Sequence, residues 1–198
     1  MLSNSSPEPE KLDLRVARTR KMLDKAFLEL LAEKGFDAIA VQDITSRAGV
    51  NRATFYAHFH DKFELLDYSI RESFRDEIRK RLLQSCHFDL ENLRRLIVAV
   101  CEYTQRLRSH CVPAQRQFEP LVENQIKGQL YEIILMWLKQ AENGNSPEIS
   151  ATAASWAIYG LAMQWNREAN RRKSQSAEAF ADEVLPLVAA NLRLGEIA

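Results

Sequence analysis

Residues 41–59 have the sequence VQDITSRAGVNRATFYAHF, which fits two short helices joined by a tight turn. Gly49 supplies the backbone freedom that such a turn requires, and Ala48 lets the two helices approach closely. The apolar positions form a small inner core: Ile44, Ala48, Val50 and Phe55. Helices of this length are marginal on their own, so the stretch predicts a helix-turn-helix that packs on its neighbours.

The second short helix, expected over Asn51–His58, has an N-terminal end suited to reading DNA. Asn51 is a good N-cap, which leaves Arg52, Ala53, Thr54 and Tyr56 near an exposed helix end. A recognition helix inserts such an end into the major groove, where Arg reads guanine and the methyl group of Thr or Ala contacts thymine. The stretch therefore predicts sequence-specific binding to double-stranded DNA.

Helical periodicity continues on both sides of this stretch. Apolar residues recur three, four and seven apart from Leu14 to Lys34, and Gly35 follows where a left-handed residue ends a helix. Asp61 and Glu64 form a capping box that begins a helix continuing to Leu82. We expect the aromatic residues of this region to be core: Phe55, Phe59 and Phe63.

The rest of the chain is also helical in pattern, and no segment alternates with period two for long enough to be a strand. Helices are expected over Asp89–Arg108, Leu121–Asn143, Pro147–Asn170 and Ser176–Leu194, the last with a kink at Pro186. The predicted fold is all-α, with an N-terminal three-helix DNA-binding domain and a C-terminal helical bundle. The expected organisation is a disordered tail at 1–10, the helix-turn-helix domain at 11–60 and a second helical domain at 61–198.

Composition narrows the class of protein. The 198 residues are 46% hydrophobic and 27% charged, which excludes a disordered chain or a fibre. Lys plus Arg and Asp plus Glu both number 27, so charge arguments have to be local. Three cysteines without close pairing favour a reducing cytoplasm. The N-terminus lacks the apolar segment of a signal peptide, and the longest uncharged run, 151–165, is too short to cross a membrane.

The sequence resembles the TetR family of bacterial transcriptional repressors. The resemblance rests on TFYAHFHDKFELL at residues 54–66, on Asp43-Ile44 and Arg47-Ala48-Gly49-Val50 before it, and on Gly35-Phe36. It covers about fifty residues in one register and departs from the family at Ala40, where a polar N-cap is common. The resemblance implies contacts to DNA phosphates by Tyr56 and Lys62 and a base-reading surface around Arg52, Ala53, Thr54 and His60. It places the remaining predicted DNA contacts on the first short helix, at Gln42 and Thr45.

A basic cluster at the start of the first long helix adds phosphate attraction in our interpretation: Arg15, Arg18, Arg20 and Lys21.

The helix over 147–170 is apolar almost all round between Ala151 and Trp165, so it needs cover on both sides. A second subunit is the expected cover on one side, which predicts a homodimer with a four-helix interface. The expected interface residues are Trp156, Trp165, Phe180, Val184, Leu187 and Val188.

The resemblance further implies that residues 61–198 are an effector-binding and dimerisation domain, in which a small effector binds and shifts the long fourth helix. The residues that could line the effector pocket are mostly aromatic or apolar, which favours an apolar or aromatic effector. The candidate lining residues are Tyr103, His110, Phe118, Trp137, Tyr159 and Met163. We expect no cofactor, no metal and no catalytic residue.

Two alternatives remain open at the level of sequence. Cys86-His87 and His110-Cys111 are the pairs that would suit a metal- or thiol-responsive regulator, although neither has a third partner at zinc-like spacing. A helical protein-interaction module without DNA binding is the other alternative. Salt-dependent binding to a duplex separates the DNA-binding regulator from the interaction module.

Overall fold

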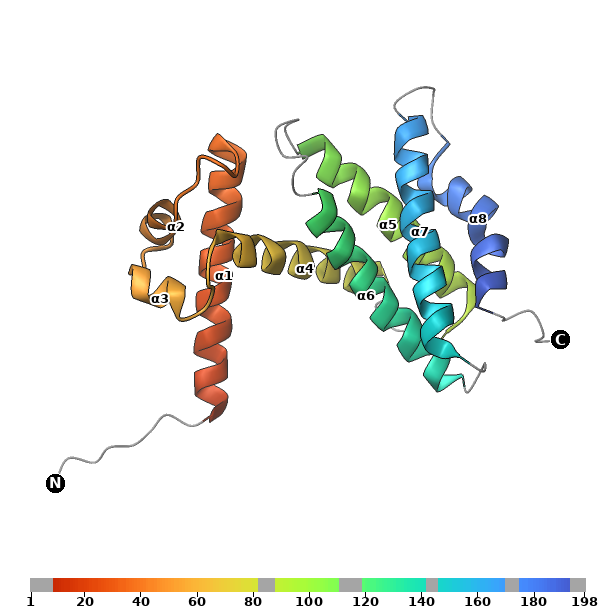
Figure 1. Cartoon of the computed structure of the whole chain (residues 1–198), viewed down its shortest axis with the longest axis horizontal. Coiled ribbons are helices and arrows are strands. Elements are labelled where there is room, and N and C mark those ends of the chain that lie inside the picture. The colour runs from red at the N-terminus through yellow and green to blue at the C-terminus, as the bar shows by residue number, and fades with distance from the viewer. Residues whose placement is uncertain (1–8, 82–87, 111–118, 142–145, 170–174, 193–198) are drawn as a thin grey trace. The chain divides into compact units, whose positions relative to one another are not determined.

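The computed structural model describes residues 9–81, 88–110, 119–141, 146–169 and 175–192, and every regular element among these residues is an α-helix (Figure 1). The all-α prediction is confirmed. The helices are α1 (Pro9–Lys34), α2 (Val41–Ala48), α3 (Arg52–Tyr56), α4 (Lys62–Arg81), α5 (Leu90–His110), α6 (Glu119–Gln140), α7 (Pro147–Ala169) and α8 (Ala177–Asn191).

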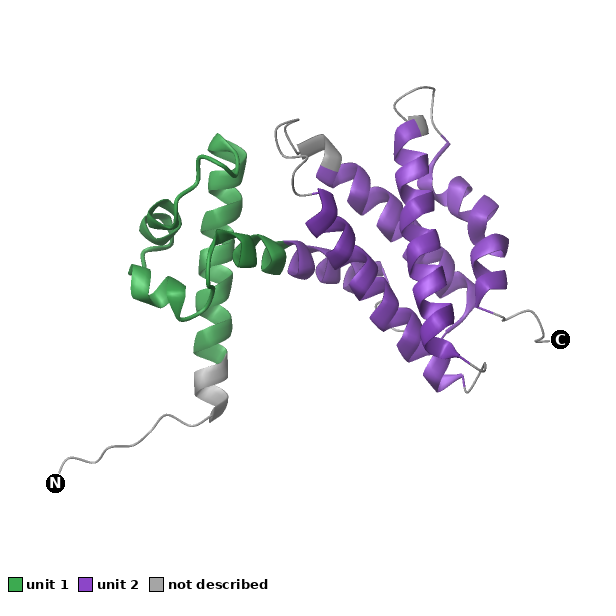
Figure 2. Ribbon diagram, viewed as in Figure 1, with its two compact units in different colours: residues 1–69 green, residues 70–198 purple. Residues whose placement is uncertain are grey.

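The chain divides into two compact units, residues 1–69 and 70–198 (Figure 2). The division falls inside α4, eight residues beyond the start of this helix, whereas the sequence placed a boundary before it. The first two turns of α4 belong to unit 1 because their side chains pack there. Leu65 and Leu66 are buried, the Ser69 hydroxyl donates to Asp24, and Tyr68 packs against Phe59.

Unit 1 is built around the apolar face of α1. Leu23, Phe27 and Leu30 are buried on this face, and the ring of Phe36 meets Phe27 edge-on at 6.1 Å. Ile44 of α2 and Phe55 of α3 are fully buried as well, as the sequence predicts. These contacts supply the tertiary packing without which two helices of eight and five residues are not stable.

Two glycines end helices in the left-handed backbone region. Gly35 has φ 73° after α1, and Gly49 has φ 68° after α2. At Gly49 the backbone N–H of Val50 donates to the carbonyl of Thr45 at 3.0 Å, which closes the turn before α3. A residue without Cβ adopts this conformation at little steric cost.

Unit 2 contains the second half of α4 and the bundle of α5 to α8. The closely packed helix pairs of the bundle are α6 with α7, α5 with α8, α5 with α7 and α7 with α8. Its core includes Leu96, Ile97, Leu130, Trp137 and Ile158. None of the described helices combines the length and apolar character needed to span a membrane. The last helix continues past Pro186 and ends at Asn191, before the end that the sequence predicted.

One hydrogen bond between polar side chains lies inside this core. The Asn166 amide on α7 donates to the Thr104 hydroxyl on α5 at 2.8 Å, and each residue is about 3% exposed. The hydroxyl in turn donates to the carbonyls of Val100 and Cys101. A buried polar pair of this kind favours one register of α5 against α7, because any other register leaves the amide unpaired.

Thr104→Val tests this pair. We expect the free energy of unfolding to fall by about 1–3 kcal/mol, since the variant keeps the shape but leaves the Asn166 donor without its acceptor. Denaturant unfolding of Thr104→Val, Asn166→Leu and the double variant measures the coupling. The double variant should cost less than the sum of the single variants, and strict additivity would contradict the assignment.

Candidate nucleic-acid interface

The start of α3 is fixed by Asn51. Its side-chain oxygen accepts from the backbone N–H of Thr54 at 2.7 Å and from the Thr54 hydroxyl at 2.9 Å. These two bonds satisfy a free N–H of the first turn and leave Thr54 half-buried. Asn51 therefore sets the direction in which α3 presents its side chains.

Arg52 and Tyr56 form the exposed face of α3. The Arg52 guanidinium lies 5.9 Å from the centre of the Tyr56 ring and donates to its hydroxyl at 3.4 Å. Both side chains are exposed, and Ala53 beside them is exposed as well. A cation and a phenol held together in this way can contact the phosphates and base edges of a duplex.

Most of the remaining predicted DNA contacts also lie on the surface of unit 1. Gln42 on α2 and His60 before α4 are exposed, and Gln42 donates to the hydroxyl of Ser46 at 3.2 Å. Ser46 is exposed one turn further along α2 and is a surface position that the sequence argument did not name.

Thr45 is placed differently from the prediction. It is 1% exposed, and its hydroxyl donates to the carbonyl of Gln42 within α2. A side chain with this burial helps to pack α2 and has no surface to offer a base or a phosphate. The pattern of the short helix did not reveal this, because a threonine is common on either face.

Lys62, for which the resemblance implied a contact to DNA phosphate, is held by contacts within the protein, and the phosphate contact stays a prediction. Its ammonium donates to the carbonyls of Phe36 at 3.0 Å, Asp37 at 3.3 Å and Ile39 at 2.9 Å, and it lies 4.4 Å from the centre of the Phe36 ring. All three donor positions of the ammonium are thus engaged within the protein. In this conformation Lys62 stabilises the connection between α1 and α2.

The turn before α4 shows the cap that the sequence predicts. The Asp61 carboxylate accepts from the backbone N–H groups of Phe63 and Glu64, and Glu64 reaches back to the N–H of His60 at 2.5 Å. The prediction that Phe63 is core is wrong, however. Its ring is 50% exposed and covers Phe36 from the outside at 5.0 Å.

The basic cluster of α1 is split in the structure. Arg15, Arg18 and Lys21 are exposed, and no ion pair joins them to another described residue. Arg20 turns inward and lies over the rings of Phe59 and Tyr68, 5.6 and 5.8 Å from their centres. The phosphate attraction predicted for four residues is thus available from three.

Ion pairs made by Arg47 and Asp43 of α2 attach this helix to α1. Arg47 donates to both carboxylate oxygens of Glu33 at 2.8 Å and to Glu29 at 3.4 Å. Lys34 pairs with Asp43 at 2.7 Å, and Asp43 also accepts from the backbone N–H of Ala40. The hydrogen bond from Arg47 lowers the pKa of Glu33, and the bond from Lys34 lowers the pKa of Asp43. Asp43 thereby supplies part of the cap that Ala40 lacks.

The predicted dimer residues of unit 2 fall into two groups. Trp156 and Leu187 are exposed, at 61% and 64%. The others pack inside the bundle instead of on its surface, which corrects the prediction: Trp165, Phe180, Val184 and Val188. Trp165, for example, donates through its indole N–H to the carbonyl of Gln175 and packs near Phe180.

The predicted effector residues are not gathered at one described surface. Trp137 and Tyr103 are buried in the core, and Tyr159 and Met163 of α7 are half-buried. Phe118 and the side chain of His110 lie outside the described residues.

The cysteine and histidine pairs are for the most part not described. Cys86, His87 and Cys111 lie outside the described residues, and the part of the chain that the structure describes contains no group of three potential metal ligands. Cys101 is described and buried. Burial, with a smaller effect from the charge of Glu102, raises the pKa of its thiol to about 12, so it is not a reactive thiolate.

The region that contains this surface is similar in sequence to known proteins. Residues 23–68 match the sequence profile described as "Bacterial regulatory proteins, tetR family". The uncharacterized HTH-type transcriptional regulator YxbF of Bacillus subtilis (strain 168) is 50% identical over 68 residues, which cover 33% of this chain and 18% of that protein. The HTH-type dhaKLM operon transcriptional activator DhaS of Lactococcus lactis subsp. lactis (strain IL1403) is 35% identical over 60 residues, 30% of this chain and 32% of that protein.

The matched part of each curated relative is therefore less than a third of its length. A solved structure, the TetR transcriptional regulator from Streptococcus agalactiae 2603V, superposes with a TM-score of 0.52 at 17% identity. The superposition covers 91% of this chain and 99% of that chain. It shows that the fold of this chain is similar to the fold of that protein.

The placement of Lys62 gives a prediction. Lys62→Met keeps the apolar stem and removes three hydrogen bonds, so we expect the free energy of unfolding to fall by about 1–3 kcal/mol. The salt dependence of duplex binding should stay as in the parent, whereas Arg18→Gln should reduce it if Arg18 contacts a phosphate. Thermal unfolding and binding titrations at several salt concentrations measure both. A slope reduced by about one in Lys62→Met with unchanged stability would restore the phosphate role.

Proposed function

We propose that this chain, whose residues 23–68 match the profile of the tetR family, is a sequence-specific DNA-binding transcriptional regulator. It binds a palindromic operator as a homodimer and is released by a small effector. The observation that carries the proposal is the exposed pair of Arg52 and Tyr56 on α3, held in place by the Asn51 cap and by the attachment of α2 to α1.

The DNA-binding surface consists of Arg52, Ala53 and Tyr56 of α3 together with Gln42 and His60, all of which are exposed. Arg52 is the candidate for reading a guanine, and Ala53 for contacting a thymine methyl. The exposed cations of α1 add attraction to phosphates. Thr54, which is half-buried, supports this surface through its bonds to Asn51.

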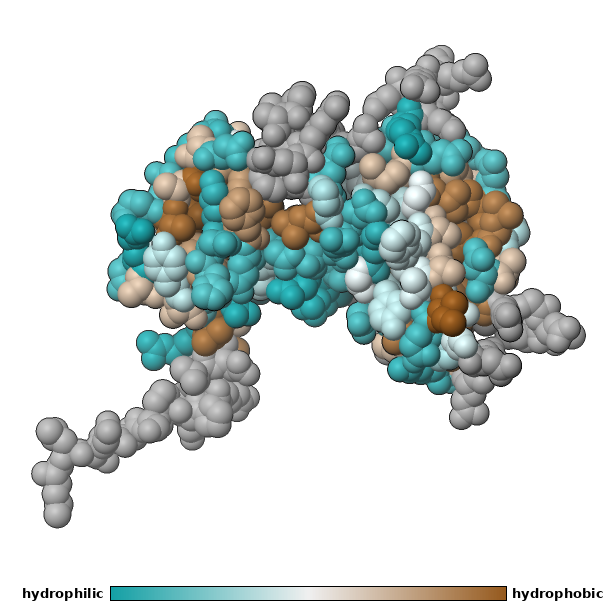
Figure 3. Space-filling model, in the orientation of Figure 1, coloured by the Kyte–Doolittle hydropathy of each residue, from teal (hydrophilic) through white to brown (hydrophobic). Residues whose placement is uncertain are grey.

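The homodimer forms through the outer faces of α7 and α8. Apolar surface extends over this part of unit 2 (Figure 3). Ile149 and Trp156 of α7 and Leu187 of α8 are each more than 60% exposed. The Trp156 ring is held by Lys127, whose ammonium lies 3.7 Å from the ring centre. Large side chains ordered in this way at a surface are typical anchors of an interface.

The effector binds in unit 2, and the half-buried Tyr159 and Met163 are the described candidates for contacting it. Aromatic and thioether groups favour an apolar or aromatic compound. Such a compound releases DNA if it binds better to the conformation that does not fit the operator. The metal- or thiol-responsive alternative gains no support from the buried Cys101.

The direct test is selection of duplexes from a random pool, followed by a metabolite screen for release. A regulator of this kind enriches a two-fold symmetric site, and its affinity falls steeply as salt rises. A protein that enriches no site at low salt would contradict the proposal. Highly charged compounds as the sole releasing agents would contradict an apolar effector.

Arg52→Ala should weaken binding to the selected operator by about 1–3 kcal/mol and relax one base position, because the lost guanidinium carries sequence information. Selection profiles of the parent and the variant measure this directly. Arg95→Gln is the matched control, since Arg95 lies on α5 in unit 2 and its guanidinium pairs with Glu91 on the same helix. Its base preferences should equal those of the parent, and an unchanged profile in Arg52→Ala would remove Arg52 from the reading surface.

Trp156→Glu should weaken the homodimer by about 2 kcal/mol or more, since it places a charge at the centre of an apolar interface. Analytical ultracentrifugation over a concentration series measures the dissociation constant. Leu90→Glu on α5 is the control, because Leu90 is 54% exposed and does not belong to α7 or α8. Equal effects of the two substitutions would place the interface elsewhere.

A further inference from the structure

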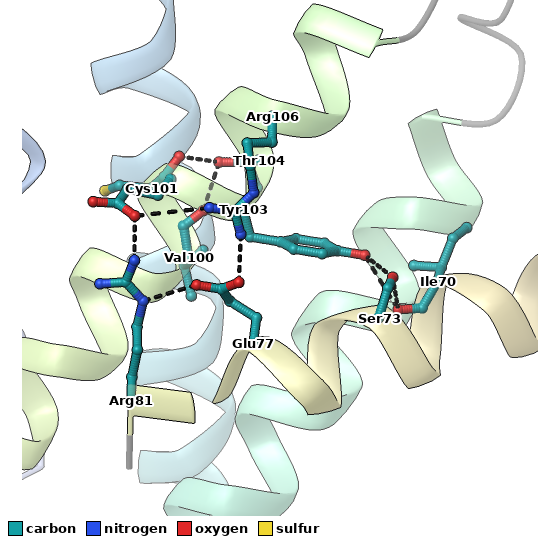
Figure 4. A network of polar contacts seen from close by, with 10 residues as sticks. Ile70, Ser73, Glu77, Arg81, Val100, Cys101, Tyr103, Thr104 and Arg106 are labelled. Atoms are coloured by element: carbon teal, nitrogen blue, oxygen red, sulfur yellow. Dashed lines mark hydrogen bonds and ion pairs between the residues drawn. The ribbon is translucent and has the colours of Figure 1, made fainter. Parts of the chain in front are cut away.

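The second half of α4 meets α5 through long polar side chains (Figure 4). Ile70, Ser73, Glu77 and Arg81 recur at helical spacing on α4, and they face Glu102, Tyr103 and Arg106 on α5. Apolar packing adds Phe74, whose ring lies 5.0 Å from that of Tyr103. This half of the helix is thus held by directional polar contacts in addition to the buried Phe74 and Ile78.

Four of these residues form a closed ring of alternating charge. The Glu77 carboxylate accepts from Arg81 at 2.8 Å and from Arg106 at 2.5 Å. The Glu102 carboxylate accepts from Arg81 and lies 3.8 Å from a nitrogen of Arg106. Two edges of the ring run within a helix, and two cross between α4 and α5.

The ring is partly shielded from water at Glu77, whose side chain is 12% exposed. Burial alone would raise the pKa of Glu77, but the bond from Arg81 and the charges of Arg106 and Arg81 outweigh it and leave the pKa lowered. Glu77 therefore stays ionised at neutral pH. The attraction within a shielded pair is screened less than on an open surface, and removing one partner leaves the other charge unpaired.

The Tyr103 hydroxyl of α5 makes a second polar contact with α4, one to two turns before Glu77. It lies 2.6 Å from the Ser73 hydroxyl and donates to the carbonyl of Ile70 at 3.2 Å. Tyr103 is 5% exposed, so this end of the contact is buried. The ring and the Tyr103 hydroxyl together, which we call the α4 clasp, define one register of α4 on α5.

We propose that the α4 clasp is the positioning element of operator binding and that Glu77 and Arg106 are its positioning residues, distant from DNA. The inference rests on the proposed function. The same continuous helix carries residues 62–69 into unit 1, so fixing residues 70–81 restricts how the DNA-binding unit is presented. Opening the clasp lets α4 occupy several poses, and the apparent operator affinity falls by the fraction of molecules that remain competent.

The test compares Arg106→Gln with Arg94→Gln. Arg94 is on the same helix, but its guanidinium pairs with Asp182 on α8. Each variant thus removes one α5 arginine from one interhelical carboxylate, and only the first touches the clasp. Affinities are measured for the selected full operator and for a duplex with a single half-site, together with thermal unfolding of each protein.

We expect Arg106→Gln to weaken binding to the full operator about fivefold or more, and to leave binding to the half-site unchanged. A single head needs no fixed presentation, so the half-site reports the DNA surface alone. Arg94→Gln should leave both affinities as in the parent. Glu77→Gln should behave like Arg106→Gln, and the double variant should cost no more than the worse single variant.

Three outcomes would overturn the inference. Equal operator affinities of Arg106→Gln and Arg94→Gln would show that the loss is general. An equal loss on the half-site would show that the substitution damages the DNA-binding unit itself. Additive effects of Glu77→Gln and Arg106→Gln would show that the two residues do not act through each other. A parent protein that enriches no duplex would instead refute the proposed function, and this inference with it.

Discussion

The attachment of two short helices to α1 is the constraint on which the DNA-binding unit depends. Segments of eight and five residues do not hold a helical conformation by themselves in water. Arg47 therefore spans from α2 to Glu33, Lys34 reaches Asp43, and Lys62 gathers the carbonyls between α1 and α2. These ionic contacts act at the edge of a core that includes Phe27 and Phe55. The position of the DNA-reading surface on α3 therefore depends on these contacts.

Local signals in the sequence predicted the order of the helices in this unit, although α1 begins at Pro9, before the predicted Leu14, and α3 is shorter than predicted. Gly49, Asn51 and Asp61 act within four residues of themselves, so their roles as turn, cap and cap follow from the chain alone. The α2 bounds are those that the pattern predicts. The orientations of the Arg20, Lys62 and Phe63 side chains could not be predicted from the sequence. Each depends on a ring or a carbonyl that the fold brings from a distant segment.

In the bundle, the sequence predicts even less of where individual side chains lie. A helix that is apolar almost all round does not reveal which of its sides faces its own subunit. In α7 and α8 the structure assigns Trp165 and Phe180 to the core and leaves Trp156 and Leu187 outside. The polar contacts were still harder to anticipate, since Thr104 and Asn166 are 62 residues apart. Buried polar pairs and ion rings specify register, which hydrophobic patterning alone leaves open.

The division of the chain within α4 has a consequence for how such proteins can be recombined. A graft of one regulator's DNA-binding unit onto another's helical bundle, joined at the loop before α4, would separate Asp24 from the Ser69 hydroxyl that donates to it and Arg20 from the ring of Tyr68. A splice between Ser69 and Ile70 preserves both sets of native neighbours. It also has to keep the helical phase, because a single inserted residue turns everything downstream by about 100°. Natural chimaeras of this architecture are thus expected to exchange parts in the middle of a helix.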